Sequence, residues 1–115
     1  MAKINYVELP VKDVAGTQDF YGKAFGWSFT GYGPDYAAME GGEVALGLNG
    51  TDDQAIGAVL VLVEVEDLEA ALASVTAAGG SVTVPIFAFP GGRRFHFRDP
   101  AGNELGVFIN EPDQH

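Results

Sequence analysis

The 115-residue sequence contains no cysteine, which excludes disulfides, thiolate metal sites and cysteine nucleophiles. It also has little positive charge, since six Lys and Arg stand against sixteen Asp and Glu, for a formal net charge of −10. That excess of acid repels phosphates and argues against nucleic acid and anionic membranes as partners. No run approaches the roughly 18 apolar residues of a membrane span. Residues 1–5 lack the apolar segment of a signal peptide, so we expect a cytoplasmic protein.

What the sequence does contain is enough apolar surface for one packed domain. Hydrophobic residues make up 47% of the chain, and its length is that of a single domain. Sixteen glycines indicate many tight turns between short strands.

An internal repeat organises the chain. At an offset of 54, residues 7–14 align with residues 61–68, and both stretches carry apolar side chains at every second position up to residues 11 and 65, followed by an aspartate at 13 and 67. Each half then reads as a strand, a helix and three strands, which predicts an α+β fold of two βαβββ modules with curved mixed sheets. We predict one domain over residues 1–115, with module 1 at about 1–50, a linker at about 51–56 and module 2 at about 57–112.

Capping residues mark the two predicted helices. Asp13 and Asp67 can cap helices, and Gly26 and the pair Gly79-Gly80 can end them. The first helix is expected over residues 13–25. The apolar side of the second should carry Leu68, Ala71, Leu72, Val75 and Ala78. Two strands should run over Val7–Val11 and Val59–Val65, and the others near residues 27–31, 35–40, 43–49, 81–87, 93–98 and 103–110.

Four aromatic residues at the first helix, Phe20, Tyr21, Phe25 and Trp27, are best interpreted as core residues that join helix to sheet, rather than as ligand contacts. Each helix should cover the convex face of its sheet. The concave face is then either buried or open as a ligand cup, and it is where we expect function.

Three segments together resemble the vicinal oxygen chelate superfamily, which includes glyoxalase I, bleomycin resistance proteins and extradiol dioxygenases. They are residues 8–13 leading into Phe-Tyr-Gly-Lys-Ala-Phe-Gly-Trp at 20–27, residues 65–80, and Asp-Pro-Ala-Gly-Asn at 99–103. The last is also a hairpin sequence in its own right. The resemblance spans nearly the whole chain and implies paired βαβββ modules, and commonly a homodimer.

The resemblance also implies where a divalent metal would bind. The family's first-strand ligand would fall on Tyr6 and, in the second module, on Leu60; the last-strand ligand would fall on Gly106, with Leu46 as its first-module counterpart. Leucine and glycine offer no lone pair, and tyrosine is a poor ligand at neutral pH. We therefore predict no metal site and no cofactor.

Two histidines are present, His96 and the terminal His115. Strand alternation puts His96 on one face with Arg94 and Arg98. That face either lies in water, which its basic neighbours favour, or points into the cup. The preceding Pro-Gly-Gly-Arg-Arg at 90–94 is interpreted as a polar hairpin rather than an anion site.

Glu8 shares a strand face with Tyr6, so both should line the cup if it is open. Two interpretations of Glu8 are equally favoured. It pairs with an arginine on a neighbouring strand, or its carboxylate binds a cation or acts as a weak base. Glu64 is a more marginal candidate. The full set of predicted ligand-binding residues is Tyr6, Glu8, Leu60, Leu62, His96 and Phe108.

The favoured hypothesis is a metal-free protein resembling the glyoxalase and bleomycin resistance group, which binds a small cationic or neutral molecule in an apolar cup. A metal-dependent lyase, isomerase or dioxygenase with a site relocated around His96, Glu8 and Tyr6 is a second hypothesis. A structural or regulatory dimer without ligand is a third.

Overall fold

The computed structural model describes residues 2–51 and 58–111, and these form two compact units with an α+β fold. The first unit is Asn5–Leu60, and the second comprises Met1–Ile4 and Val61–His115. Most of the predicted linker and the predicted end of module 2 lie outside the described residues, so the module boundaries stay a prediction. In the described part of the chain, no helix is long and apolar enough to cross a membrane.

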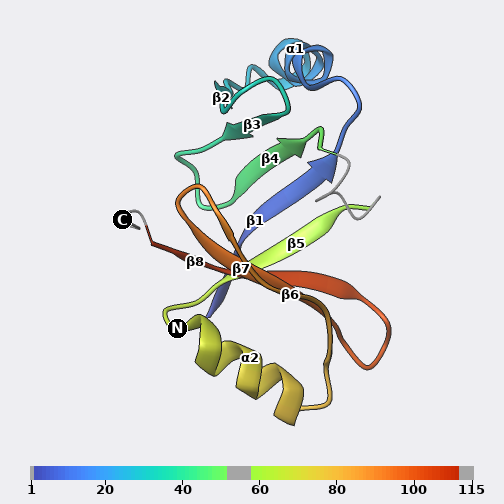
Figure 1. Ribbon diagram of the computed structural model, residues 1–115. Coiled ribbons are helices and arrows are strands. Elements are labelled where there is room, and N and C mark those ends of the chain that lie inside the picture. The colour runs from blue at the N-terminus through green and yellow to red at the C-terminus, as the bar shows by residue number, and fades with distance from the viewer. Residues whose placement is uncertain (1, 52–57, 112–115) are drawn as a thin grey trace. The chain divides into compact units, whose positions relative to one another are not determined.

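The first unit has the predicted order of one strand, one helix and three strands (Figure 1). Its strand order is β2-β3-β4-β1, in which β1 and β4 are parallel and the other neighbours are antiparallel. The elements are β1 Lys3–Pro10, α1 Val14–Phe25, β2 Thr30–Gly31, β3 Tyr36–Met39 and β4 Ala45–Asn49.

Helix α1 begins and ends where the sequence predicts. The Asp13 carboxylate accepts a hydrogen bond from the Gly16 backbone N–H at 2.9 Å, which caps one of the free amides of the first turn. At the other end Gly26 has φ +74°, a left-handed conformation that glycine adopts without strain, and its N–H bonds Gly22 O at 2.9 Å.

The core of the first unit is small, and the predicted aromatic residues are not in it. Val14, Ala37 and Leu48 are buried between helix and sheet, and Leu9, Val11, Phe29 and Leu46 pack against them. Phe20, Phe25 and Trp27 are 61%, 62% and 37% exposed, so their interpretation as core residues was wrong, whereas Tyr21 is half-buried.

Trp27 explains part of this difference. It was expected to open a strand, but β2 begins only at Thr30. The indole stacks instead on Tyr21, with ring centroids 5.6 Å apart, and lies 4.9 Å from the Phe25 ring. The rings therefore pack on one another rather than on the sheet.

The second unit repeats the plan with strand order β5-β8-β7-β6. Strands β5 and β8 are parallel, and the other neighbours are antiparallel. Its elements are β5 Leu60–Glu64, α2 Leu68–Ala77, β6 Ser81–Phe89, β7 Gly92–Arg98 and β8 Glu104–Asn110 (Figure 1).

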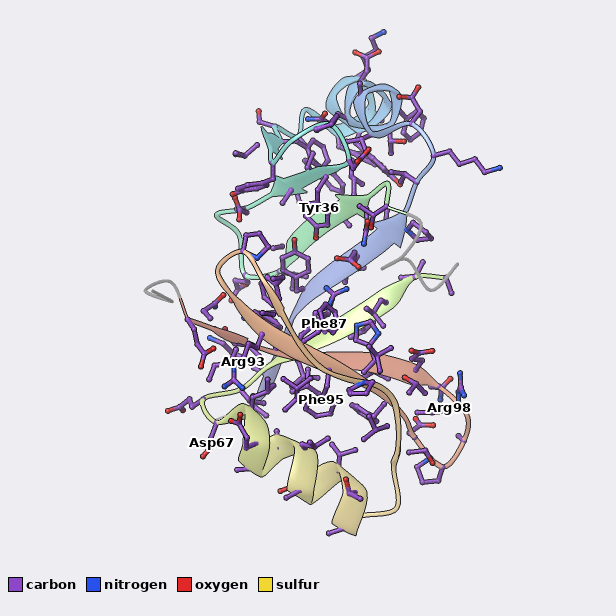
Figure 2. The ribbon with its side chains drawn as sticks, in the orientation of Figure 1. Tyr36, Asp67, Phe87, Arg93, Phe95 and Arg98 are labelled. Atoms are coloured by element: carbon purple, nitrogen blue, oxygen red, sulfur yellow. The ribbon has the colours of Figure 1, made fainter. Side chains whose placement is uncertain are left out.

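The core of the second unit is centred on Leu68, Phe95 and Val107, and Figure 2 shows Phe95 on the α2 side of β7. The predicted stripe of α2 is confirmed at Leu68, Ala71, Leu72 and Val75, all of which join this cluster. Ala78 was also expected there but is exposed, because the helix ends at Ala77 and Ala78 is its C-cap.

The capping and turn predictions hold in this unit too. Asp67 accepts a hydrogen bond from the Ala70 N–H at 3.0 Å. Asp99 accepts hydrogen bonds from the backbone N–H groups of Ala101 and Asn103, both at 2.9 Å, and its pKa is lowered chiefly by the Asn103 N–H. The Asp-Pro-Ala-Gly-Asn segment is thus a hairpin turn that joins β7 to β8.

Candidate functional site

In the first unit, polar side chains gather on the sheet face that points away from α1. Because Leu9, Ala37 and Leu48 face the helix, strand alternation places their neighbours on the opposite face. The strand register pairs Tyr36 with Asn49, Glu8 with Gly47, and Tyr6 with Ala45. Residues from β1, β3 and β4 therefore meet there.

A hydrogen-bond network joins four of these side chains, and we call it the phenol–carboxylate cluster: Tyr6, Glu8, Tyr36 and Asn49. The Tyr36 hydroxyl donates to Glu8 Oε2 at 2.9 Å, and Asn49 Nδ2 donates to Glu8 Oε1 at 3.1 Å. The two phenol oxygens are 2.7 Å apart. Since a phenol has one proton and that of Tyr36 goes to Glu8, Tyr6 must be the donor to Tyr36.

The cluster lies in a desolvated environment. Glu8 is 5% exposed and Asn49 is 2% exposed. Burial, and then the charge of Glu8, raises the pKa of Tyr36, which keeps this phenol neutral and able to donate. The amide of Asn49 is oriented by Thr51, whose backbone N–H and hydroxyl donate to Asn49 Oδ1 at 2.9 and 2.6 Å. Glu8 is thereby held between two fixed donors.

Gly47 makes room for this cluster. A Cβ at Gly47 would collide with the Tyr36 hydroxyl and lie 2.7 Å from the Tyr6 hydroxyl. The strand register also corrects one expectation about the repeat. The 54-residue offset aligns Glu8 with Leu62; Glu8 pairs with Gly47, and Leu62 pairs with Gly106. Gly47, rather than Leu46, is therefore the counterpart of Gly106, and Leu46 packs on the α1 side.

In the second unit, the sheet face away from α2 carries basic and aromatic side chains. His96 is 1% exposed and Arg94 is 8% exposed. The favoured prediction that His96 is a solvated surface residue was therefore wrong, although the two Phe residues of β7 do face the opposite way. The Arg94 guanidinium lies 5.3 Å from the Phe87 ring centroid, and that ring lies 6.0 Å from the imidazole of His96.

Glu104 adds a carboxylate to this face. Its Oε2 lies 3.6 Å from His96 Nδ1 and accepts a hydrogen bond from the Thr83 hydroxyl at 2.8 Å. Its Oε1 lies 3.3 Å from Arg98 Nη2. Sequence reasoning missed Glu104, Tyr36 and Asn49, although the same strand alternation that selected Tyr6, His96 and Phe108 would have placed all three on these faces.

Five of the six predicted binding residues fall into two groups. Tyr6 and Glu8 come together in the first unit. Leu62, His96 and Phe108 share the second unit's face, where a Cβ on Gly106 would lie 3.4 Å from the imidazole. Leu60 is 2% exposed at the start of β5. The marginal candidate Glu64 accepts a hydrogen bond from Asn110 Nδ2 at 2.7 Å.

The residues at the family's ligand positions do not fit a divalent metal. Gly47, Gly106 and Leu60 have no donor atom, and the Tyr6 hydroxyl is hydrogen-bonded to Tyr36. Across residues 2–51 and 58–111, no group of three or more His, Cys, Asp or Glu is arranged to hold an ion.

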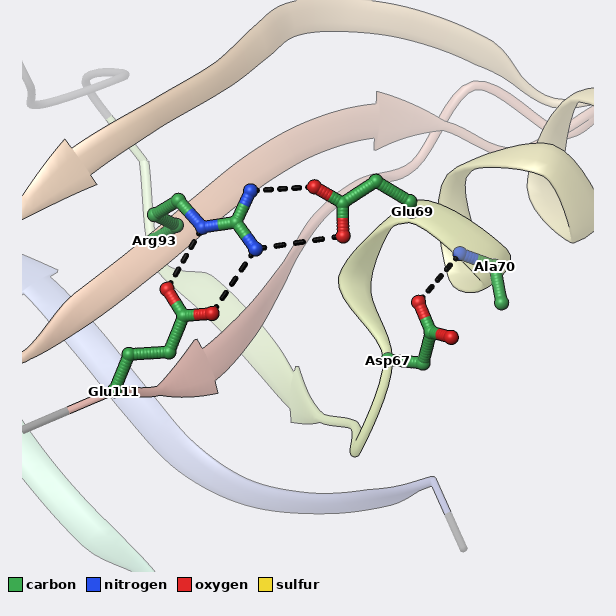
Figure 3. A network of polar contacts seen from close by, with 5 residues as sticks. All are labelled: Asp67, Glu69, Ala70, Arg93 and Glu111. Atoms are coloured by element: carbon green, nitrogen blue, oxygen red, sulfur yellow. Dashed lines mark hydrogen bonds and ion pairs between the residues drawn. The ribbon is translucent and has the colours of Figure 1, made fainter.

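The β6–β7 loop has the structure of a polar hairpin. Arg93 forms an ion pair with Glu69 of α2 and bonds Glu111 through Nε at 2.7 Å (Figure 3). These carboxylates raise the pKa of Arg93, Glu111 most, and Arg93 in turn lowers the pKa of Glu69. The Arg93 guanidinium therefore pairs with two carboxylates of its own unit, and this pairing favours the hairpin interpretation over an anion site.

Comparison with known proteins gives both a family and a fold. The family model of the Glyoxalase/Bleomycin resistance protein/Dioxygenase superfamily matches residues 3–107. A search of curated proteins found no significant match.

Several solved structures share the fold. An NAD-dependent benzaldehyde dehydrogenase from Legionella pneumophila is 19% identical, with a TM-score of 0.77, over 93% of this chain and 99% of that one. Methylmalonyl-CoA epimerase from Mycobacterium tuberculosis is 14% identical, also at 0.77, over 95% and 88%. The Mn(II)-bound glyoxalase from Novosphingobium aromaticivorans is 23% identical, at 0.66, over 95% and 40%. At these identities the likeness establishes the fold alone.

Proposed function

Because this chain belongs to the Glyoxalase/Bleomycin resistance protein/Dioxygenase superfamily, we propose that it uses the family fold to bind a small cationic or neutral molecule without a metal ion. The observation that carries the proposal is the phenol–carboxylate cluster. At Gly47, where the family pattern places a metal ligand, the space is filled by the hydroxyls of Tyr36 and Tyr6. In this proposal, hydrogen-bonding side chains stand where a metal-binding relative would have its metal ligands.

The chemistry of the cluster favours positive or hydrogen-bond-donating ligands. Glu8 is a buried carboxylate whose two oxygens each accept a neutral hydrogen bond, from Tyr36 and from Asn49. These two donors orient the carboxylate, and a carboxylate is a group that binds cations and hydrogen-bond donors. The net charge of −10 acts in the same direction at longer range.

The proposed ligand contacts remain Tyr6, Glu8, Leu60, Leu62, His96 and Phe108. In the first unit, Glu8 would provide the charge of the proposed site and Tyr6 a phenol. Leu62, His96 and Phe108 stay predicted contacts on the sheet face of the second unit. The proposal also keeps a cytoplasmic location, which rests on the cysteine-free sequence.

A thermal-shift panel tests the proposal. Small primary and quaternary ammonium compounds, their neutral isosteres and matched carboxylates are each added to the wild type, Glu8→Gln and Glu43→Gln. Glu43 is exposed in the first unit, so its substitution removes the same charge away from the cluster. We expect cations or neutral compounds to raise the Tm of the wild type and Glu43→Gln but not of Glu8→Gln. Stabilisation by carboxylates alone, or an equal response in Glu8→Gln, would contradict the proposal.

One observation favours a second candidate, an enzyme with a relocated site. His96 Nδ1 lies 3.6 Å from Glu104, and a carboxylate beside an imidazole can orient it for proton transfer or metal binding. A lyase, isomerase or dioxygenase reaction that needs a divalent metal and is lost in His96→Ala would establish this candidate. A dimer with a regulatory role and no ligand would show neither response.

A further inference from the structure

Asn49 of the phenol–carboxylate cluster is followed by a glycine, Gly50. Of the four asparagines of the chain, it is the only one that precedes a glycine, since the other three precede tyrosine or glutamate. In an Asn-Gly pair the side-chain amide is lost most readily, because glycine has no Cβ to hinder the approach of its backbone nitrogen to the side-chain carbon. The most reactive side-chain amide of the chain therefore belongs to the candidate site.

The packing around Gly50 explains why a glycine follows Asn49. A Cβ at Gly50 would lie 2.9 Å from Val14 Cγ2 and 3.3 Å from the Asp35 carbonyl oxygen. Val14 belongs to the buried core, and the Asp35 carbonyl accepts a hydrogen bond from the Gly50 N–H, so neither neighbour gives way without cost. The fold thus requires both members of the pair, because the amide of Asn49 bonds Glu8 and Gly50 fits against the core.

The folded chain fixes both groups that would react. The Gly50 N–H donates to the Asp35 carbonyl at 2.8 Å. The Asn49 side chain is 2% exposed and is held at both ends, since its Nδ2 donates to Glu8 at 3.1 Å and its Oδ1 accepts two hydrogen bonds from Thr51 at 2.9 and 2.6 Å. The Gly50 nitrogen reaches Asn49 Cγ only if the backbone leaves its extended conformation and these bonds break.

We propose that Asn49 is a deamidation site that the fold keeps unreactive, and that its conversion, after local opening at the end of β4, irreversibly destroys the phenol–carboxylate cluster. Asn49 is the last residue of β4 and pairs with Pro10, the last residue of β1 (Figure 1). Strand ends open at a lower free energy than strand centres, so this pair can open without unfolding of the whole chain. The proposal is independent of the ligand proposed above, because it concerns only atoms of the cluster itself.

The reaction needs water as its only co-reactant. In the opened chain the backbone nitrogen of Gly50 attacks Asn49 Cγ; the new N–Cγ bond forms, the Cγ–Nδ2 bond breaks, and Nδ2 leaves as ammonia with the proton that the Gly50 N–H gives up. The product is a five-membered cyclic imide. Water that adds to Cγ opens the ring to aspartate, whereas water that adds to the backbone carbonyl carbon opens it to isoaspartate, in which the chain runs through Cγ.

Either product breaks the cluster. With aspartate at position 49, the donor that faces Glu8 Oε1 becomes a second carboxylate oxygen, and two adjacent carboxylates in a buried site repel each other. Isoaspartate also lengthens the backbone by one carbon at a residue that pairs with Pro10 of β1 and Tyr36 of β3. Because Tyr36 supplies the other hydrogen bond to Glu8, this change of register would disturb both donors.

The first test measures the reaction at each asparagine. Folded protein and protein unfolded in guanidinium chloride are incubated in the same mildly alkaline buffer, and peptide mapping by mass spectrometry follows the replacement of the amide by a carboxylate. We expect the unfolded chain to convert at Asn49 faster than at Asn5, Asn103 and Asn110. The folded chain should convert at Asn49 about a hundredfold or more slowly than the unfolded chain.

A pair of core variants tests whether the opening is local. Val14→Ala removes a methyl group that packs beside Gly50, so it should speed the conversion of Asn49 in the folded protein. Leu68→Ala is the matched control, because Leu68 is buried in the core of the second unit. It should speed the conversion much less than Val14→Ala.

The second test measures the damage that conversion causes. Asn49→Asp reproduces one product and should lower the Tm by about 5 °C or more. Asn110→Asp is its matched control, because Asn110 Nδ2 also donates to a glutamate, Glu64, but at an exposed position; it should lower the Tm by less than about 2 °C. The double variant Asn49→Asp with Glu8→Gln should recover part of the lost Tm, since it removes one of the two opposed charges.

Three outcomes would overturn the proposal. One is a folded protein that converts at Asn49 as fast as the unfolded chain, or an unfolded chain that converts no faster at Asn49 than at the other asparagines. Another is an equal acceleration by Val14→Ala and Leu68→Ala, which would assign the reaction to unfolding of the whole chain. The third is an Asn49→Asp variant with the Tm of the wild type, which would show that conversion leaves the cluster intact.

Discussion

The two units follow the same plan but place their largest side chains differently. The second unit buries an aromatic ring, Phe95, completely between β7 and α2. The buried core of the first unit is formed by Val14, Ala37 and Leu48, and the rings of α1 stay outside it. A repeated order of strands and helices therefore sets the backbone plan of both units, but it does not decide which side chains each helix buries.

The sheet faces away from the helices also differ in chemistry. Gly47 and Gly106 occupy equivalent places, opposite Glu8 and Leu62. In the first unit the space beside the glycine holds phenols bonded to a carboxylate, and in the second it borders an imidazole and a leucine. The repeat has kept the small residue in both units and changed the functional groups around it.

We expect the largest changes in the free energy of unfolding from substitutions in the two cores. Phe95→Ala should lower the free energy of unfolding by about 3–5 kcal/mol, because a fully buried ring leaves a cavity. Leu48→Ala should cost about 2–5 kcal/mol in the smaller core of the first unit. Phe20→Ala, at the exposed face, should change the stability of the monomer by less than about 0.5 kcal/mol. Urea unfolding of the three variants is the measurement, and a Phe20→Ala loss as large as that of Phe95→Ala would remove the difference between the units.

The two equivalent glycines should respond differently to a methyl group. Gly47→Ala should cost about 1–3 kcal/mol, since its Cβ meets the Tyr36 and Tyr6 hydroxyls, which are held by hydrogen bonds. Gly106→Ala should cost less, because its Cβ meets the flexible end of the Leu62 side chain. Denaturant unfolding measures both. Combining Gly47→Ala with Tyr36→Phe should cost less than the sum of the two single changes, and strict additivity would show that the crowding is absent.

The polar cluster of the first unit predicts an alkaline loss of stability. The raised pKa of Tyr36 means that above its ordinary value of 10.0 the folded chain holds a proton that the unfolded chain has lost. Stability from this group is therefore fully present below pH 10 and falls as the pH rises above it. Tyr36→Phe should cost about 1 kcal/mol at neutral pH and flatten the alkaline fall. An equally steep fall in Tyr36→Phe, measured by unfolding over this pH range, would assign it to other groups.

The smallest effect is expected at the exposed ion pairs of the second unit. Arg93 lowers the pKa of Glu69 below its usual 4.5, so the stability from this contact is present above that pH and is lost as the pH falls through the lower folded value. Glu69→Gln should lower the Tm slightly near neutral pH and less in acid, since Glu69 is then protonated in the wild type. Melting curves across the acid range measure the difference, and an effect of Glu69→Gln that grows on acidification would reverse the assigned sign.

Much of the fold could be predicted because it depends on local signals. Asp13 and Asp67 cap their helices, Gly26 ends α1, and strand alternation gave the order of elements in both units. The exceptions are Trp27, Phe20 and Phe25, whose apolar side chains predicted burial. Pattern alone says that an aromatic residue prefers to be covered, but it does not say whether its own sheet extends far enough to cover it.

The candidate site could be predicted only in part for a related reason. Alternation along each strand gives the face on which Tyr6, Glu8, Tyr36 and Asn49 lie. That Tyr36 and Asn49 meet Glu8 depends on the pairing of β3, β4 and β1. That register is set by contacts between distant segments, and a one-residue error in it selected Leu46 in place of Gly47. His96 was expected in water because its strand neighbours are basic. Its imidazole lies instead beside the Phe87 ring of β6 and Gly106 of β8, and the sequence of β7 alone cannot reveal these contacts.

We propose that in this family member a hydrogen-bonded phenol–carboxylate cluster stands in the place of the donors of a metal site. The most direct measurement is divalent metal binding: elemental analysis of the untagged protein, followed by thermal melts with Mn, Fe, Ni and Zn. A metal that binds only the folded state must raise the Tm. We predict no stoichiometric metal and no shift for the wild type. Near-stoichiometric metal, or an upward shift that Glu8→Gln or His96→Ala abolishes, would contradict the claim.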